Sequence, residues 1–439
     1  MEYKLGKKVT SEIVFMLVLL TIGMLSLALN IQPAKAEWTG TVYIRADGSI
    51  DPADAPIITY DNITYTLTDD IVSDADGMVV ERDNIIVDGN GYTLEGAESG
   101  SGFSLVAGNV TIKNTNVQKF YWGILGGPSA TECTIINNTI TYNKKAGIYF
   151  GNNDHNKIID NEIVNNALNI VEAWGIKLEY SDNNSVIGNL IENNGWTGDG
   201  IYLSYSSGNI IVENKITDHD FAGMYLDASS NNTIFHNNFI NNYYQVYSYS
   251  SANTWGNGYP SGGNYWSDYN GTDADGDGIG DTPYVIDDNN NIDRYPLMGP
   301  FNTFDAGTWN GQEFNVDVVS NSTVSNFQLN KTLKTINFNV TGVEGAASFC
   351  RITIPKIIVQ DLWHGNYTVL LNGEPWPFRN WTDTTNTYIY LNYTHSEHQI
   401  VIIPEFSSSM ALLGFLMLIT IPLIFTKKRR QTKKANKRI

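Results

Sequence analysis

The chain has 439 residues, of which 17% are charged and 42% are hydrophobic, and its formal net charge is −19. A surface this acidic repels phosphate groups, which argues against nucleic acid as a partner. The two cysteines, Cys133 and Cys350, lie far apart in the sequence and belong to no redox or zinc motif. A disulfide framework and a zinc site are therefore not expected.

The first 36 residues have the pattern of a secretory signal peptide. Lys7 and Lys8 precede an apolar run, and Ala34-Lys35-Ala36 supplies a small-residue cleavage motif. We expect Glu37 to begin the mature protein. An uncleaved membrane anchor is the alternative interpretation of the same pattern.

The last segment, residues 404–439, predicts a membrane anchor. An apolar run over 410–425 is followed by eight basic residues among the last fourteen, which should remain inside the cell. The chain between the two ends would then lie outside the cell. The charge distribution agrees with this arrangement, because both ends are net positive and a net charge of about −28 remains on residues 37–403.

Residues 77–250 contain an internal repeat. A motif of the form Asn-x-Ile recurs at intervals of 23 to 28 residues, and a Gly-apolar motif recurs with the same period. Two motifs with one period indicate one structural unit copied many times. The recurring asparagines are Asn138, Asn161, Asn189, Asn214 and Asn237.

The repeat predicts strands, because its apolar residues alternate over short runs bounded by Gly, Asn and Asp. Stacking such short units yields a right-handed parallel β-helix, here of about eight coils, with residues 37–76 as an N-terminal cap. The recurring asparagines should form a ladder, each amide bonded to those of the adjacent coils. The expected fold class is therefore all-β.

A Gly-, Asn- and Asp-rich segment, residues 251–300, follows the repeat and should cap the open end of the rod. It contains alternating acids that converge on one point when the chain turns at Gly276, with a main-chain carbonyl and a last acid to complete an oxygen cage. We expect calcium to bind there; a solvated acidic turn is the alternative. The expected ligands are Asp273, Asp275, Asp277, Ile279 and Asp281.

Residues 301–403 predict a small antiparallel β-sandwich that acts as a stalk. Alternating runs such as Phe314–Val318 and Tyr388–Leu391 are separated by turn signals such as Asn372-Gly373. This segment also carries six sequons, which predict a glycosylated surface. They are Asn321, Asn330, Asn339, Asn366, Asn380 and Asn392.

These residues carry a family resemblance. The repeat resembles the β-helix domain of the NosD-type family, linked to copper insertion, and the wider group of β-helix proteins that bind or cut carbohydrates. The tail Pro404-Glu405-Phe406, with its apolar run and basic cluster, resembles the archaeal PEF sorting signal. That resemblance implies an archaeal surface protein, processing by an archaeosortase and attachment to a lipid.

Carbohydrate is the favoured ligand, on residues of the repeated strand that should point outward. Strand side chains alternate, so the middle residue of each Gly-apolar-x-apolar strand faces solvent. Sugar rings could stack on the tyrosines of this row, while a tyrosine ladder that only stabilises the coils is the alternative. The tyrosines are Tyr149, Tyr202, Tyr225 and Tyr247.

Three other functions remain open. A polysaccharide lyase or glycoside hydrolase could use acids and a lysine on the same face; the candidates are Asp199, Lys177, Glu179 and Asp227. A purely structural or adhesive envelope protein would contact only neighbouring copies. Copper handling, which the NosD resemblance raises, is not favoured because the six histidines are scattered and soft ligands do not cluster.

Overall fold

The computed structural model describes residues 38–167, 171–195, 198–287 and 291–405. The predicted signal peptide, residues 1–36, and the predicted membrane segment, residues 410–425, lie outside the described residues. Within the described ranges, no helix is long and apolar enough to cross a membrane.

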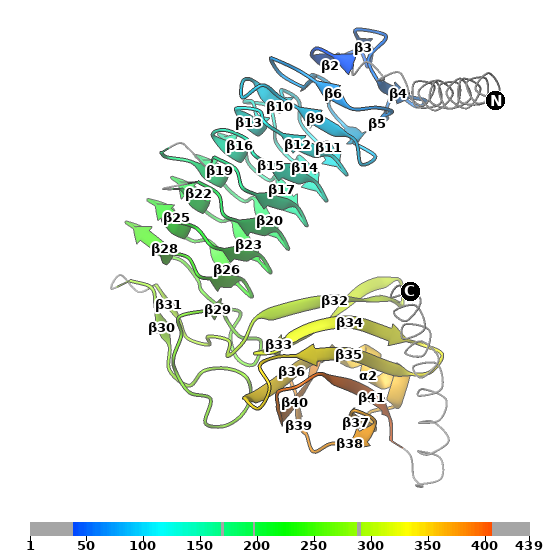
Figure 1. Cartoon of the computed structure of the whole chain (residues 1–439), viewed down its shortest axis with the longest axis vertical. Helices are drawn as coiled ribbons and strands as arrows, with labels where there is room; N and C mark the ends of the chain where they lie inside the picture. Colours follow the sequence, from blue (N-terminus) through cyan, green and yellow to red (C-terminus); the bar gives the residue numbers. More distant parts are fainter. Residues whose placement is uncertain (1–37, 168–170, 196–197, 288–290, 406–439) are drawn as a thin grey trace, which may run out of the picture.

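Three parallel sheets, A, B and C, run along a rod (Figure 1). Sheet A contains β1 (Trp38–Thr39), β6 (Ile71–Val72), β9 (Thr93–Glu95), β12 (Asn116–Gln118), β15 (Thr139–Thr141), β18 (Glu162–Val164), β21 (Leu190–Glu192), β24 (Lys215–Thr217), β27 (Asn238–Ile240) and β29 (Tyr265–Trp266). Sheet B contains β3 (Ile50–Asp51), β2 (Val42–Ile44), β7 (Met78–Val80), β10 (Ser101–Leu105), β13 (Trp122–Gly126), β16 (Ala146–Gly151), β19 (Trp174–Glu179), β22 (Asp199–Ser204), β25 (Ala222–Asp227) and β28 (Tyr244–Tyr249). Sheet C contains β4 (Ile57–Thr59), β5 (Thr64–Leu67), β8 (Ile85–Asp88), β11 (Val110–Lys113), β14 (Thr134–Ile136), β17 (Lys157–Ile159), β20 (Ser185–Ile187), β23 (Ile210–Val212) and β26 (Thr233–Phe235).

Each coil takes one strand from sheet C, then one from A and one from B, as β8, β9 and β10 show. Sheet C has nine strands in the described part of the chain, and all but β4 pair in parallel, which agrees with the expected eight coils. Residues 37–76, expected to be a cap, also build coils: β2, β5 and β6 pair in parallel with the following turns. Only β3 and β4 lie antiparallel at the N-terminal end.

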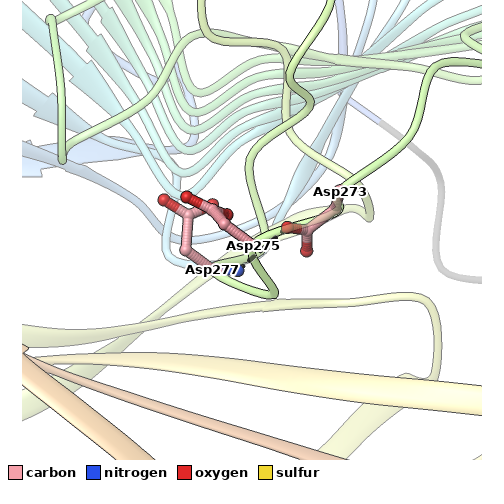
Figure 2. Close-up of side chains that lie close together, drawn as sticks. All are labelled: Asp273, Asp275 and Asp277. Atoms are coloured by element: carbon pink, nitrogen blue, oxygen red, sulfur yellow. Dashed lines mark hydrogen bonds between the residues drawn. The ribbon is translucent and has the colours of Figure 1, made fainter.

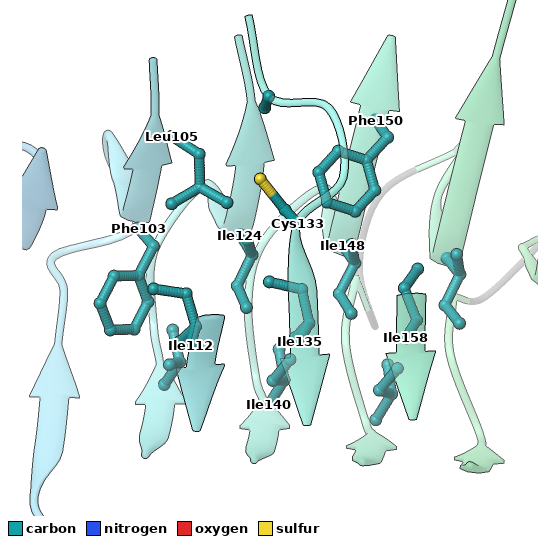
Figure 3. Packing of buried hydrophobic residues seen from close by; sticks show 14 of the residues in the cluster. Phe103, Leu105, Ile112, Ile124, Cys133, Ile135, Ile140, Ile148, Phe150 and Ile158 are labelled. Carbon is teal, nitrogen blue, oxygen red and sulfur yellow. The ribbon is translucent and has the colours of Figure 1, made fainter. Parts of the chain in front are cut away.

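Equivalent apolar residues of successive coils stack in rows inside the rod. Figure 3 shows Ile112, Ile135 and Ile158 in one row and Ile124 beside Ile148 in another, and all five are fully buried. The recurrence of the Gly motif in each coil has a steric cause. A Cβ on Gly147 would lie 2.8 Å from the carbonyl oxygen of Gly175 in the next coil, so only glycine lets the two coils approach this closely.

A buried ladder of asparagines joins the coils. The Nδ2 of Asn138 donates to the Oδ1 of Asn161 at 3.0 Å, and the same bond repeats up the rod through Asn189, Asn214 and Asn237 to Asn264. Each of these amides also donates to main-chain carbonyls, so its polar atoms are satisfied without water. Two further ladders were not anticipated from the sequence. They are Asn143, Asn166, Asn194, His219 and Asn242, and Asn156, Asn184, Asn209, Asn232 and Asn253.

The segment 251–300 covers the C-terminal end of the rod. Trp266, only 1% exposed, stacks on Phe239 of the last full coil with 4.6 Å between ring centroids, and on Tyr284 with 4.3 Å. Trp255 joins the same buried cluster. Two short antiparallel strands, β30 (Tyr284–Val285) and β31 (Ile292–Asp293), complete this cap.

Two five-stranded antiparallel sheets, E and F, follow the cap and share one apolar core (Figure 1). Sheet E contains β32 (Phe301–Trp309), β33 (Gln312–Ser320), β36 (Ala347–Pro355), β40 (Asn386–Thr394) and β39 (Arg379–Thr382). Sheet F contains β34 (Thr323–Asn330), β35 (Thr335–Thr341), β41 (His398–Pro404), β37 (Tyr367–Leu371) and β38 (Glu374–Pro375). The predicted sandwich is present, and its Asn372-Gly373 turn has both residues at positive φ, as a tight hairpin requires.

The sandwich also contains a helix that the sequence did not predict, α2 (Lys356–Trp363). It buries Ile358, Val359, Leu362 and Trp363 against the shared core. The two cysteines are free and lie in separate cores, Cys133 in the rod and Cys350 in the sandwich.

Candidate functional site

An aromatic strip lies on the outer face of sheet B. In the strand register, Tyr149 lies opposite Lys177, Lys177 opposite Tyr202, Tyr202 opposite Tyr225, and Tyr225 opposite Tyr247. The row therefore advances one coil at a time. The strip as used below consists of Trp122, Tyr149, Trp174, Lys177, Tyr202, Phe221, Tyr225, Tyr244 and Tyr247.

Two tryptophans of the strip were not anticipated from the sequence. Trp122 stacks on Tyr149 with 5.0 Å between centroids, and Trp174 stacks on Tyr202 with 5.7 Å. Both stand immediately before a glycine of the Gly-apolar motif. The aromatic residue directly before the glycine was the sequence signal that could have identified both tryptophans.

Lys177 occupies the middle of the strip. Its Nζ lies 4.4 Å from the ring centroid of Trp174 and 5.4 Å from those of Tyr149 and Tyr202, and it pairs with Glu179 at 3.2 Å. The lysine side chain is only 13% exposed. Cation–π contacts on several sides together with an ion pair engage the ammonium of Lys177 within the strip.

Glu179 is tied to the strip by Tyr149, whose hydroxyl donates to it at 2.7 Å. Burial, and then this bond to a carboxylate, raise the pKa of Tyr149 to about 12. Burial alone would raise the pKa of Glu179, but the bonds from Tyr149 and Lys177 outweigh it and lower that pKa. Glu179 is therefore an anionic acceptor.

The remaining candidate acids do not join this pair. Asp199, 4% exposed, lies opposite Trp174 and Ala222 in the register, and its Oδ1 has no hydrogen-bond partner. Burial raises its pKa well above the usual range, although the Ala222 main-chain N–H lowers it. Asp227 lies opposite Ser204, which in turn lies opposite Glu179, so the two acids stand two coils apart.

The aromatic rings are arranged differently at the two ends of the strip. Towards the N-terminus the rings stack on one another with planes 28° and 13° apart, so they cover each other's faces. Towards the C-terminus, Tyr225 and Tyr247 lie edge to face at 89°, and so do Phe221 and Tyr244 at 78°. Tyr244 and Tyr247 are 42% and 39% exposed, so ring faces are open at this end.

The acidic loop of the cap brings three of the five expected ligands together. One oxygen each of Asp273, Asp275 and Asp277 lies within 4.8 Å of the others (Figure 2). Slight burial, and then the neighbouring Asp277 and Asp273, raise the pKa of Asp275. A divalent cation would relieve this crowding of oxygen donors, and oxygen is the donor that calcium prefers.

The other two expected ligands shape the loop. Asp281 accepts a hydrogen bond from the Ala274 main-chain N–H at 2.7 Å, which ties the ends of the loop together. The side chain of Ile279 is buried beside Leu297. The loop rests against sheet E, where Arg379 donates to the Gly276 carbonyl at 2.9 Å.

The three histidines of the rod lie apart, whereas His395 and His398 both lie against Tyr393 in the sandwich. His155 is exposed, His219 lies in a ladder, and His236 is buried at the end of the rod. In the part of the chain that the structure describes, Asp273, Asp275 and Asp277 form the group that could hold a metal ion.

Five of the six sequons in the sandwich are exposed, and Asn339 is half-buried. Two of the exposed amides already donate hydrogen bonds, Asn321 to the Ala347 carbonyl at 3.1 Å and Asn380 to the Tyr367 hydroxyl at 2.8 Å. The other exposed sequons are Asn330, Asn366 and Asn392.

Residues 101–259 match the family model described as "Right handed beta helix region". In the structure these residues form successive parallel coils. They contain the whole aromatic strip. The parallel coils agree with the fold expected from the repeat.

Two curated relatives match part of the chain, and both are named "Probable ABC transporter binding protein NosD". The protein from Pseudomonas aeruginosa is 39% identical over 105 residues, which cover 24% of this chain and 23% of the relative. The protein from Stutzerimonas stutzeri is 38% identical over 91 residues, 20% of each chain. The matched part thus spans less than a quarter of either relative.

Solved structures with similarity to the chain include a periplasmic alginate epimerase, AlgG, which is 18% identical with a TM-score of 0.33 over 42% of this chain and 51% of the other. The Dettilon tailspike protein is 11% identical with a TM-score of 0.32 over 83% and 85%. A tailspike capsular polysaccharide depolymerase of an Acinetobacter baumannii bacteriophage is 10% identical with a TM-score of 0.28 over 80% and 72%. Scores of this size carry no argument about activity.

Proposed function

We propose that this protein binds a polysaccharide through the aromatic strip of its β-helix and does not cleave it. The observation that carries the proposal is the open C-terminal end of the strip, where Tyr225, Tyr244 and Tyr247 present ring faces at large mutual angles. Sugar rings stack on aromatic faces through their C–H groups, and exposed aromatic side chains with few rotamers make good anchors. Asp227 beside Tyr225 supplies a hydroxyl acceptor.

The arrangement of the candidate catalytic groups supports binding over cleavage. A hydrolase needs two carboxyl groups facing one bond, and a lyase needs a free base. Lys177 is enclosed by three rings and paired with Glu179. Asp199 lies apart from that pair, opposite Trp174.

A polysaccharide retention assay tests the proposal. The full-length protein is run through native gels that contain one immobilised polysaccharide each, and the variant pair Tyr244→Ala and Tyr247→Ala is compared with Tyr60→Ala. Tyr60 is 95% exposed and lies far from the strip. We expect retention of the wild type and the control, and at least tenfold weaker retention of the pair.

The same polysaccharides serve in a turnover assay. New reducing ends or unsaturated uronate, abolished by Asp199→Asn, would make the protein an enzyme and overturn the proposal. No retention of any polysaccharide by the wild type would favour the structural or adhesive role instead.

Calcium is proposed as a structural ligand of the acidic loop. The fit rests on the three converging carboxylates, with the Ile279 carbonyl and Asp281 as further candidate donors. Because the loop belongs to the cap and rests against sheet E, bound calcium would stiffen the junction between rod and sandwich.

We place the protein on the outside of the cell, anchored at its C-terminus. This placement rests on the sequence patterns of residues 1–36 and 404–439, which lie almost wholly outside the described residues. It includes processing by an archaeosortase-type enzyme, for which mass spectrometry of the mature C-terminus is the test. An intact basic tail in the mature protein would contradict it.

A further inference from the structure

A second aromatic row stands beside the strip, at the turn where each coil leaves sheet B. Tyr180 and Tyr205 occupy the same position in adjacent coils, each 54% exposed. Their rings stack with 5.0 Å between centroids and 9° between planes. The sequence pattern of the outward row did not point to either residue.

The backbone at this position is left-handed in every coil from Asn152 onward, with φ of 60°, 49°, 48°, 47° and 49° at Asn152, Tyr180, Tyr205, Ala228 and Ser250. Asparagine adopts this conformation readily, whereas a bulky residue does so at a cost of order 1 kcal/mol. The fold does not require tyrosine here, because Ala228 and Ser250 serve the same turn. The turn alone therefore does not dictate two adjacent exposed tyrosines at this position.

The geometry leaves one face of Tyr205 open. The centroid separation of 5.0 Å matches the spacing of about 4.8 Å between coils, so the ring planes stack along the rod. Tyr180, in the preceding coil, covers one face of the Tyr205 ring. The other face is turned to the next coil, where the small side chain of Ala228 stands at the equivalent position.

Hydrogen-bond acceptors separate this row from the aromatic strip. Glu179, Ser204 and Asp227 form the intervening row, in register in successive coils. The distance from Tyr225 to Ala228 is three residues, about 10 Å of strand. A short run of linked sugar rings can therefore reach from the strip to the open face of Tyr205, across Asp227.

We propose that the open face of Tyr205, above Ala228 and beside Asp227, is a separate subsite for one sugar unit of a neutral polysaccharide. The subsite rests on the proposed polysaccharide binding and specifies the direction of the sugar chain, which runs along a strand from the strip to the turn. Neutral sugars fit because the carboxylate of Asp227 accepts hydroxyl hydrogen bonds and repels a carboxylated or sulfated chain. The ammonium of Lys177 offers no compensation, since Glu179 neutralises it.

Two single substitutions at the turn position, one in each of two adjacent coils, test the subsite. Tyr205→Ala copies the residue that the next coil carries, and Ala228→Tyr copies the residue that the preceding coil carries, so both side chains are known to suit this backbone. The first substitution removes the ring on which the sugar would stack, and the second covers the open face of that ring. We expect each variant to weaken retention on a neutral polysaccharide gel about tenfold, with Tyr60→Ala unchanged.

The outcomes separate the subsite from the proposed function. Loss of retention in the Tyr244→Ala and Tyr247→Ala pair together with wild-type retention of Tyr205→Ala and Ala228→Tyr would overturn the subsite and leave the strip. Tighter binding of a uronate polymer than of every neutral polymer would overturn the ligand class. A dimer that forms without polysaccharide and is lost in Tyr205→Ala, with retention unchanged, would make the tyrosine pair a contact between copies and also overturn the subsite.

Discussion

The ring of His236 stacks on the ring of Phe301, with 4.1 Å between their centroids and 20° between their planes. His236 belongs to the last full coil of the rod, and Phe301 begins the first strand of the sandwich. Beside them, the side chain of Asn238 accepts from the Phe301 main-chain N–H at 2.7 Å and donates to its carbonyl at 2.8 Å. Rod and sandwich are thus joined by a buried, satisfied contact.

We predict that Asn238→Ala uncouples the two parts. Both main-chain groups of Phe301 would lose their partners in a buried place, which costs roughly 2–4 kcal/mol. In calorimetry we expect the variant to unfold in two resolved transitions, whereas the transitions of the wild type lie closer together in temperature. Asn315→Ala, at an exposed position of sheet E, is the control; a single unshifted transition in Asn238→Ala would contradict the prediction.

His219 makes the rod sensitive to acid. It replaces asparagine in a buried ladder, where one ring nitrogen lies 2.9 Å from Asn242 Oδ1 and the other 3.4 Å from Asn194 Nδ2. Burial lowers the pKa of His219 to about 4, against the bond to Asn242 and the charge of Asp218. The unfolded chain therefore takes up the proton first, and stability present above the unfolded pKa of about 6.5 is lost as pH falls towards 4.

The substitution His219→Asn restores the amide of the neighbouring coils and removes this titration. We expect the variant to gain, relative to the wild type, on the order of 3 kcal/mol between pH 7 and pH 4. Urea unfolding at several pH values measures it, with the exposed His155→Asn as control. Parallel pH profiles for His219→Asn and the wild type would show that the histidine does not titrate with folding.

Asp199 should make the stability of the protein depend on pH in the opposite direction to His219. Burial raises its pKa well above the usual range, so the folded protein keeps a proton that the unfolded chain releases. Stability from this group is present at low pH and falls as pH rises through the raised pKa. Asp199→Asn should therefore stabilise the protein increasingly as pH rises, by at most about 1.4 kcal/mol for each pH unit. A stability difference that does not change with pH would refute this reading.

The effect of the Asp275→Asn substitution on the melting temperature should depend on whether calcium is present. Without calcium the substitution removes one of three crowded carboxylates, so we expect a small rise in melting temperature. With calcium in excess the wild type should gain several degrees, and the variant should gain less because it lacks a charged ligand. Scanning calorimetry with calcium and with a chelator measures both effects, and Asp54→Asn, exposed and far from the loop, is the control. Equal melting temperatures of the wild type with and without calcium would remove the structural role.

Much of the fold was predictable because it repeats. The asparagines at 23- to 28-residue intervals predicted the ladder through Asn138 to Asn237, and the Gly motif predicted the strands of sheet B. The helix α2 was not predictable in the same way. Its eight residues contain three β-branched ones, and packing of Leu362 and Trp363 on the sandwich core outweighs this local preference.

The candidate site was predictable only in part. Alternation along each strand placed Tyr149, Tyr202, Tyr225 and Tyr247 on one face, since that property is local. Nothing local showed that Trp174 would stack on Tyr202, or Tyr180 on Tyr205, because these contacts join residues 25 or more positions apart in the chain.

The sequence by itself determined the parallel β-helix, its row of outward tyrosines, the acidic loop and the antiparallel sandwich, since each follows from spacing and alternation within a short stretch. Tertiary structure decided which ring faces remain open, how Lys177 is neutralised, and how rod and sandwich meet. Those features depend on side-chain directions in neighbouring coils and on the path of the cap. They are set by packing between segments that no single stretch of sequence contains.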